Sequence, residues 1–285
     1  MRGSLASELM LLWKARRVDT LLTLAGGLII GCIMIMALAA PLIAPYDPYV
    51  SVSKALQPPS PRHPMGTDNL GRDVFSRVVY GSRIVLVVVL TSTLASMVVG
   101  TILGLLSGYF GGYVDRALSV VMDSIYAFPG LILAIAVAAM LGPGVVNTVV
   151  AISAVYVPTY FRMVRGQVLT VKSQLYVEAA KALGADHKTI MLKYILPNVL
   201  PILPVVFSMN VADAVLTEAA LSFLGLGVPA PTPDWGFDLR NGQRNLLAGY
   251  WWISTFPGFF IVLLALGFSL LGEGLNELLN PSRRW

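Results

Sequence analysis

The chain has 285 residues, of which 56% are hydrophobic and only 12% are charged, against roughly 25% charged in soluble domains. This composition excludes an ordinary soluble domain and predicts an all-α protein that crosses a membrane several times. The formal net charge of +5 does not indicate nucleic acid as a partner, because the basic residues lie at the ends of apolar segments and form no patch interleaved with aromatic residues. A single cysteine, Cys32, excludes an internal disulfide and a cysteine-based metal site.

Residues 1–80 are predicted to form an N-terminal unit. Leucines recur at helical spacing in residues 1–19, which favours an interfacial helix that leads into the membrane. The apolar run 21–43 is too long for the core of a signal peptide, which spans about 7–15 residues, and is predicted to be the first membrane span, uncleaved. Residues 44–80 are rich in proline and polar residues and are predicted to be the first external loop.

Residues 81–275 are predicted to form a second unit that holds the remaining membrane spans, followed by a cytoplasmic tail over 276–285. Each of its apolar runs is long enough for a hydrocarbon core of about 30 Å; they are 84–108, 117–141, 146–164, 199–222 and 252–275. The fourth of the six predicted spans contains Pro158, which membrane helices tolerate. With the N-terminus inside, 13 of the 20 Lys and Arg residues fall on the cytoplasmic side, which predicts that both termini are cytoplasmic.

Gly100, Gly104 and Gly108 follow one another at four-residue intervals in the second predicted span. Small residues at this spacing let two membrane helices approach closely. Packing within the chain is the favoured interpretation, and a subunit interface is the alternative.

A polar segment between the fourth and fifth predicted spans is expected to form two short helices. Ser173 is a plausible N-cap for a helix over 174–183, and Gly184 stands where a left-handed residue would end it. Asp186 can cap a second helix, which Pro197 is expected to end. Helices this short are marginal in water, so they need a partner surface.

The motif Glu-Ala-Ala at 178–180, followed by Gly184 and by Leu-Pro at 196–197, resembles the EAA loop of ABC importer permeases. In that family the loop is the coupling helix that docks on the ATP-hydrolysing subunit. The two alanines are expected to present a flat face to that partner. Tyr194 departs from the family pattern, which has isoleucine there. The resemblance implies a coupling role for Glu178, Ala179, Ala180, Gly184, Asp186 and Pro197.

The stretch Gly-Thr-Asp-Asn-Leu-Gly-Arg-Asp at 66–73 only superficially resembles a phosphate-binding loop. Such a loop needs Lys and then Ser or Thr after its last glycine, whereas this chain has Arg72 and Asp73. The chain is therefore expected to bind no cofactor and to be no enzyme, with ATP and Mg²⁺ held by partner subunits.

Residues 63–78 are similar to the external-loop signature of the second permease in the dipeptide/oligopeptide/nickel branch of ABC permeases. The signature residues are Gly66, Thr67, Asp68, Gly71, Arg72 and Asp73. Further similar stretches are 108–115, 221–227 with 231–236, and 256–258 with 271–275, so the resemblance runs over most of residues 63–281. Asn276 and Asn280 depart from it, because the branch usually has Arg and Asp there.

The resemblance implies a six-span permease with the type I importer fold, in the inner or plasma membrane, that works by alternating access. It also implies the partners: a second homologous permease in a heterodimer, two ATPase subunits or domains, an extracytoplasmic solute-binding protein and the lipid bilayer. Short peptides are the expected solute, and nickel or another small solute is the alternative. A stand-alone secondary transporter or channel is a different alternative, which predicts intramembrane ionisable pairs and inverted repeats; the sequence has one deep carboxylate and no convincing repeat.

That deep carboxylate, Asp213, is the candidate for lining the pathway, because a charge inside the membrane usually faces a cavity or a partner. Asp123 and Glu218 lie near span ends and are expected to be solvated there. His63 and His187 are predicted to lie on opposite sides of the membrane, which excludes a shared metal site.

Overall fold

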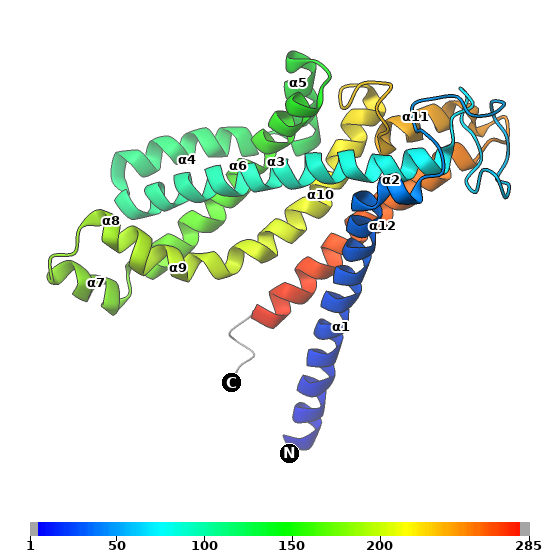
Figure 1. Cartoon of the computed structure of the whole chain (residues 1–285). Helices are drawn as coiled ribbons and strands as arrows, with labels where there is room; N and C mark the ends of the chain where they lie inside the picture. Colours follow the sequence, from blue (N-terminus) through cyan, green and yellow to red (C-terminus); the bar gives the residue numbers. More distant parts are fainter. Residues whose placement is uncertain (1–4, 280–285) are drawn as a thin grey trace.

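The computed structural model describes residues 5–279, and the side chains of residues 19–278. In that part of the chain the regular elements are helices (Figure 1). They are α1 (Leu5–Leu38), α2 (Ala40–Ile43), α3 (Val74–Phe110), α4 (Gly112–Tyr126), α5 (Gly130–Leu141), α6 (Val145–Lys172), α7 (Leu175–Ala182), α8 (His187–Thr189), α9 (Leu196–Val199), α10 (Leu203–Leu224), α11 (Trp235–Leu246) and α12 (Trp252–Leu279).

Five helical stretches in the described residues are long and apolar enough to cross a membrane, and a bent pair makes a sixth if it counts as one span. The five are Asp19–Leu38, Val74–Phe110, Val145–Lys172, His187–Leu224 and Trp252–Leu278. The all-helical membrane fold is thus confirmed. The bent pair is α4 with α5, whose axes differ by 92°, so the span predicted over 117–141 is broken into two helices. Pro129 lies at the break, and a proline disfavours helical conformation in the residue before it.

Two boundaries near the N-terminus also differ from the sequence prediction. From Leu5 onward α1 is one continuous helix, so residues 5–19 and the first span form a single element, and the interfacial position of its first residues stays a prediction. The first loop ends at Asp73 rather than at residue 80, because the Asp73 side chain accepts a hydrogen bond from the Ser76 N–H and so caps α3. By contrast, α6 continues through Pro158 without a break.

The helix after α7 does not end at Pro197, contrary to the prediction. A π-helical turn over Ile190–Ile195 joins α8 to α9, and the chain continues into α10 as one span. Pro197 lies in the first turn of α9, directly after the π-helical turn, and its missing N–H does not end the span. The second half of the polar segment, from His187 onward, is therefore continuous with a membrane-spanning helix.

The three regularly spaced glycines of α3, Gly100, Gly104 and Gly108, pack against α6 of the same chain. This confirms the interpretation that they serve packing within the chain. A Cβ atom on Gly104 would lie 2.7 Å from the Phe161 carbonyl oxygen and 2.9 Å from Val164 Cβ. One turn on either side, Gly100 and Gly108 likewise face the backbone or Cβ atoms of α6. Since these glycines have no side chain, the two helices approach closely along their length.

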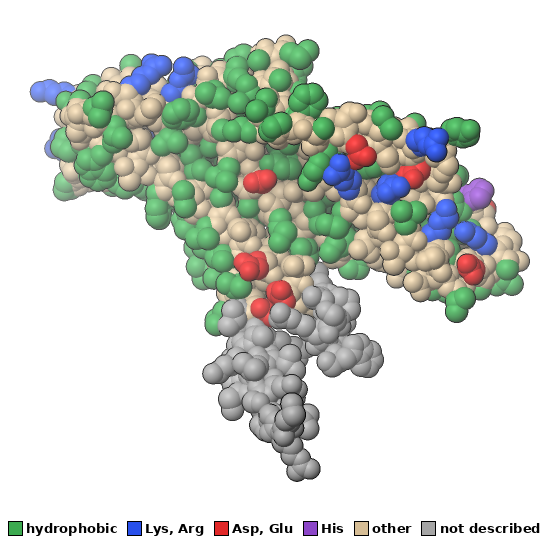
Figure 2. Space-filling model, turned by 180° about the vertical axis from the view of Figure 1, so that it is seen from behind, with side chains coloured by type: hydrophobic (Ala, Val, Ile, Leu, Met, Phe, Trp, Pro, Cys, Tyr) green, Lys and Arg blue, Asp and Glu red, His purple; other side chains and the backbone are tan. Residues whose placement is uncertain are grey.

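The first loop and α7 lie at opposite ends of α3 (Figure 1). With 37 residues, α3 is about 55 Å long, well beyond a hydrocarbon core of about 30 Å. We call residues 44–73 together with α11 the loop lobe, and α7 with α8 the α7–α8 hairpin. Figure 2 shows Lys and Arg side chains gathered toward the two ends of the molecule, with hydrophobic side chains over much of the face between them.

Candidate functional site

The end of α7 is formed as its sequence predicts. Gly184 has a φ of +85°, a left-handed conformation that glycine adopts at little cost. Its N–H donates to the Lys181 carbonyl, and the Ala185 N–H donates to the Ala180 carbonyl, both at 3.0 Å. These two hydrogen bonds form the Schellman motif, so the predicted C-cap at Gly184 is confirmed.

The start of α8 also follows the prediction, whereas the start of α7 does not. Asp186 Oδ1 accepts a hydrogen bond from the Thr189 N–H at 3.3 Å, and this bonding to Thr189 lowers the pKa of the Asp186 carboxyl. The Ser173 hydroxyl is no N-cap for α7. It donates instead to the Thr170 carbonyl at 2.9 Å in the last turn of α6, and Gln174 precedes α7 without a side-chain cap.

The predicted flat alanine face on α7 is wrong, because the two alanines point in different directions. Ala180 is buried within the chain, on the same side as the fully buried Val177. Ala179 is exposed, and it lies between Leu175 and Leu183, which are 82% and 88% exposed. Residues at i, i+4 and i+8 share one side of a helix. We call Leu175, Ala179 and Leu183 the outer face of α7.

Tyr109, at the end of α3, anchors the hairpin to the spans. Its hydroxyl oxygen lies 2.7 Å from His187 Nδ1 in α8, and its carbonyl accepts a hydrogen bond from Lys172 Nζ of α6 at 2.5 Å. Lys181 Nζ of α7 lies 6.0 Å from the centre of the Tyr109 ring, which is itself buried. Tyr109 therefore joins the hairpin to both α3 and α6. Tyr109 was missed by sequence reasoning; its only signal was its place in the family-like stretch 108–115.

Asp213 lies on an open groove of about 310 Å³ formed by α5, α6 and α10. The lining residues are Gly130, Leu131, Val155, Tyr156, Asp213, Leu216 and Thr217. The hydroxyls of Tyr156 and Thr217 lie 3.1 Å apart there, so the groove has a small polar centre in apolar walls. The role of Asp213 as a pathway residue stays a prediction.

The other two acidic residues differ from each other. Asp123 is exposed and paired with Arg162 at 2.7 Å, as expected for a carboxylate near a span end. Glu218 is fully buried, so the expectation that it would be solvated is wrong. Its Oε1 accepts a hydrogen bond from the Ser222 hydroxyl at 3.0 Å, one turn further along α10. The segment that follows α10 folds back over it, since the Val228 N–H donates to the same hydroxyl.

The signature residues of the first loop point inward. Asp68 binds the Arg72 side chain at 2.6 Å and the Arg72 N–H at 2.9 Å. Asp73 contacts His63 Nδ1 at 2.9 Å as well as capping α3. The Thr67 carbonyl accepts a hydrogen bond from the Trp252 indole, while Gly66 and Gly71 have positive φ. The signature therefore folds the loop and presents no open site.

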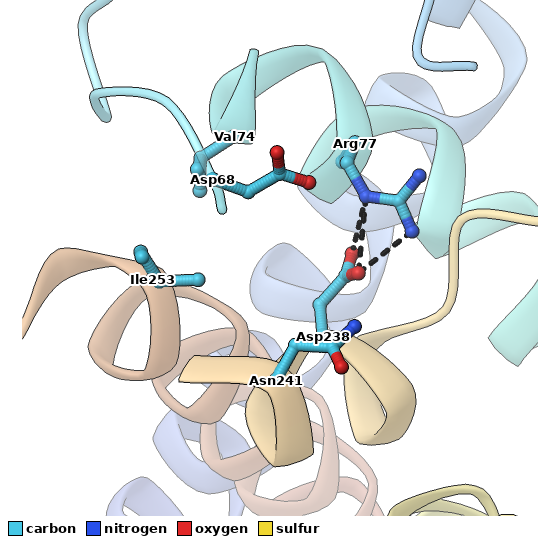
Figure 3. A pocket seen from close by; sticks show the side chains of 6 residues that line it. All are labelled: Asp68, Val74, Arg77, Asp238, Asn241 and Ile253. Carbon is cyan, nitrogen blue, oxygen red and sulfur yellow. Dashed lines mark hydrogen bonds and ion pairs between the residues drawn. The ribbon is translucent and has the colours of Figure 1, made fainter. Parts of the chain in front are cut away.

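A buried ion pair joins the loop lobe to α3 (Figure 3). Arg77 Nη2 lies 2.6 Å from Asp238 Oδ1, and the Arg77 Nε lies 3.0 Å from both carboxylate oxygens. Burial raises the pKa of the Asp238 carboxyl, and the Arg77 charge opposes that rise. The adjoining cavity of about 10 Å³ has the size of one water molecule. Arg77 falls within the family-like stretch 63–78, but nothing local in the sequence links it to a position 161 residues away.

Known proteins resemble this chain over nearly its whole length. Residues 100–285 match the family described as binding-protein-dependent transport system inner membrane component, and residues 22–59 match the N-terminal TM domain of oligopeptide transport permease C. The probable D,D-dipeptide transport system permease protein DdpC of Escherichia coli K12 is 40% identical over 91% of this chain and 87% of its own.

Two glutathione transport system permease proteins, both GsiD, are as similar. The protein of Shigella flexneri is 40% identical over 91% of this chain and 86% of its own, and that of Salmonella typhimurium is 40% identical over 94% and 89%. These relatives are transport permeases, not enzymes. With a family match over more than half of its length and a helical membrane fold that fits it, the chain belongs to the binding-protein-dependent transport system inner membrane components, the permease subunits of ABC importers.

Proposed function

We propose that this permease forms half of the translocation pathway of an ATP-driven importer for short peptides. The relatives named for D,D-dipeptides and for glutathione, both short peptides, support this solute class. Nickel is less well supported, because the described residues contain no group of three His, Cys, Asp or Glu side chains placed to hold a metal ion.

The outer face of α7 is the observation that carries the proposal. The helix lies at one end of the molecule (Figure 1). Its two leucines flank a small alanine, and all three side chains are exposed. An apolar helix face in this position fits a groove on another protein. We propose that the groove belongs to the ATPase partner, which puts the hairpin and both termini in the cytoplasm.

The contacts of Tyr109 supply a route from that partner to the pathway. Closure of two ATPase subunits around ATP would move the hairpin, and Tyr109 would pass the movement to α3 and α6. The groove at Asp213 lies between α6 and two neighbouring helices, where a second permease would complete the pathway. A solute-binding protein would dock on the loop lobe. ATP then shifts a two-state equilibrium through differential contacts at the hairpin.

ATP-dependent uptake of a labelled dipeptide into vesicles that contain the whole transporter tests the proposal. The double variant Leu175→Asp, Leu183→Asp should lose uptake by about tenfold or more, because burying unpaired carboxylates at an apolar contact costs several kcal/mol. The matched control is the double variant Leu175→Met, Leu183→Met, which keeps the outer face of α7 apolar and should keep uptake. Normal uptake by the aspartate double variant would contradict the coupling role. Uptake of another solute, but no peptide, by the unaltered transporter would contradict only the solute class.

A further inference from the structure

A second groove, of about 350 Å³, lies between α1 and α3 and shares no element with the groove at Asp213. Its lining residues are Met34, Ala37, Leu38, Arg83, Leu86, Val87, Leu90 and Thr91. The α3 residues recur at i, i+3, i+4, i+7 and i+8, so they form one stripe along the helix. The stripe is about 12 Å long, with Arg83 at the end nearer the loop lobe and Thr91 at the other.

The groove is open toward the outside of the two spans. Ala37 and Leu86 are buried and form its floor, whereas Leu38 and Val87 are 74% and 51% exposed. In a chain that belongs to a membrane family, apolar side chains on the outside of a span face lipid tails or another protein. Lipid tails fit this groove, because its exposed lining is apolar and lies on the outside of two spans.

Arg83 adds a positive charge to the otherwise largely apolar lining of the groove. Its side chain is exposed, and among the described residues its charge meets the ring of Tyr80, with Cζ 5.8 Å from the ring centre, but no carboxylate. Arg77, two turns earlier on α3, is already paired with Asp238. Arg83 therefore lies where α3 leaves the loop lobe, with a guanidinium free to bind a phosphate in a bidentate manner.

We propose that this groove binds a phospholipid in the leaflet on the side of the loop lobe. The acyl chain lies along the stripe from Leu86 to Thr91, against Met34 and Leu38 of α1, and the phosphate pairs with Arg83. The order of groups along the groove, a cation at the lobe end and apolar side chains beyond it, matches the order of a phospholipid from headgroup to tail. The bound lipid would fill the space between α1 and α3.

Photolabelling of the whole transporter tests the site. The transporter is reconstituted in vesicles of phosphatidylethanolamine and phosphatidylglycerol that contain phosphatidylglycerol with a photoactivatable acyl chain, and labelled peptides are identified by mass spectrometry. Label should concentrate in residues 34–38 and 86–91. Arg83→Gln should lower it about fivefold, the effect of one basic side chain near a membrane surface. Val87→Trp should abolish it by filling the groove.

The matched control is Arg244→Gln, an exposed arginine in the last turn of α11, which should leave the labelling unchanged. Equal labelling of these segments in all variants would mean that only unspecific boundary lipid lies there, and would overturn the proposal. Cross-linking of the same segments to the second permease, without lipid label, would overturn it as well. Uptake assays on the same vesicles show that each variant is assembled.

Discussion

Arg77 and Asp238 join segments far apart in the chain at a buried point. Both side chains are nearly inaccessible to water, and the Arg77 Nη1 also donates to the Pro48 carbonyl at 3.0 Å. Removing one partner of a buried pair is costly because it leaves the other charge unpaired in a medium of low polarity. Together with the hydrogen bond from the Trp235 indole to the Val78 carbonyl, this contact ties the loop lobe to the start of α3.

Arg77→Met should destabilise the protein by about 3–5 kcal/mol. The loss should depend on pH, because burial raises the pKa of Asp238 and the variant lacks the charge that opposes the rise. A carboxyl with a raised folded-state pKa binds a proton more tightly when folded, so the stability of the variant falls as pH rises. Thermal unfolding at about pH 5 and about pH 8 measures both effects. Arg244→Met, at an exposed site, is the control; an Arg77→Met defect that is equal at both pH values would contradict the prediction.

Tyr109→Phe should partly uncouple peptide transport from ATP hydrolysis. The ring keeps its packing, but the hydrogen bond to His187 is lost, and such a bond contributes about 0.5–1.5 kcal/mol. We expect the number of peptides imported per ATP hydrolysed to fall about threefold to tenfold while hydrolysis continues. Tyr113→Phe, at an exposed tyrosine of α4, is the matched control. An unchanged ratio of uptake to hydrolysis would show that Tyr109 is only structural.

At the scale of elements, the sequence predicts those features that depend on hydrogen bonds between residues close together in the chain. Gly184 and Asp186 act on backbone groups within a few residues, so both caps were predictable. Which way Ala180 points depends on how α7 lies against the spans, and the burial of Glu218 depends on the segment that folds back after α10. These are tertiary effects with no local signal. Pro129 and Pro197 look alike in sequence, yet one lies at a 92° bend and the other in a continuing span.

Gly104→Ala should weaken the packing of α3 on α6. The new methyl group would lie 2.7 Å from the Phe161 carbonyl oxygen, and overpacking of this kind costs about 1–3 kcal/mol, against a gain in helix propensity of at most about 1 kcal/mol. The midpoint of thermal unfolding of the purified assembly should therefore fall. Gly31→Ala in α1 is the matched control, because nothing lies within 4 Å of its new methyl group. A midpoint that rises equally in both variants would contradict the packing argument.

At the scale of the whole molecule, the loop lobe and the α7–α8 hairpin contact opposite ends of α3 (Figure 1). The groove at Asp213 lies on α5, α6 and α10. The family signature in the first loop maintains the fold of the loop lobe. The exposed leucines of α7 are available to a partner at the other end of α3.

The central claim is that the outer face of α7 binds the ATPase partner. A photoreactive amino acid in place of Leu183, in the intact transporter in its native membrane, tests this most directly. We predict a cross-link to the ATPase subunit that changes in yield when ATP binds, and no such product from the same substitution at Leu247. A cross-link from Leu183 to the solute-binding protein, or only to lipid, with no ATPase product, would contradict the account.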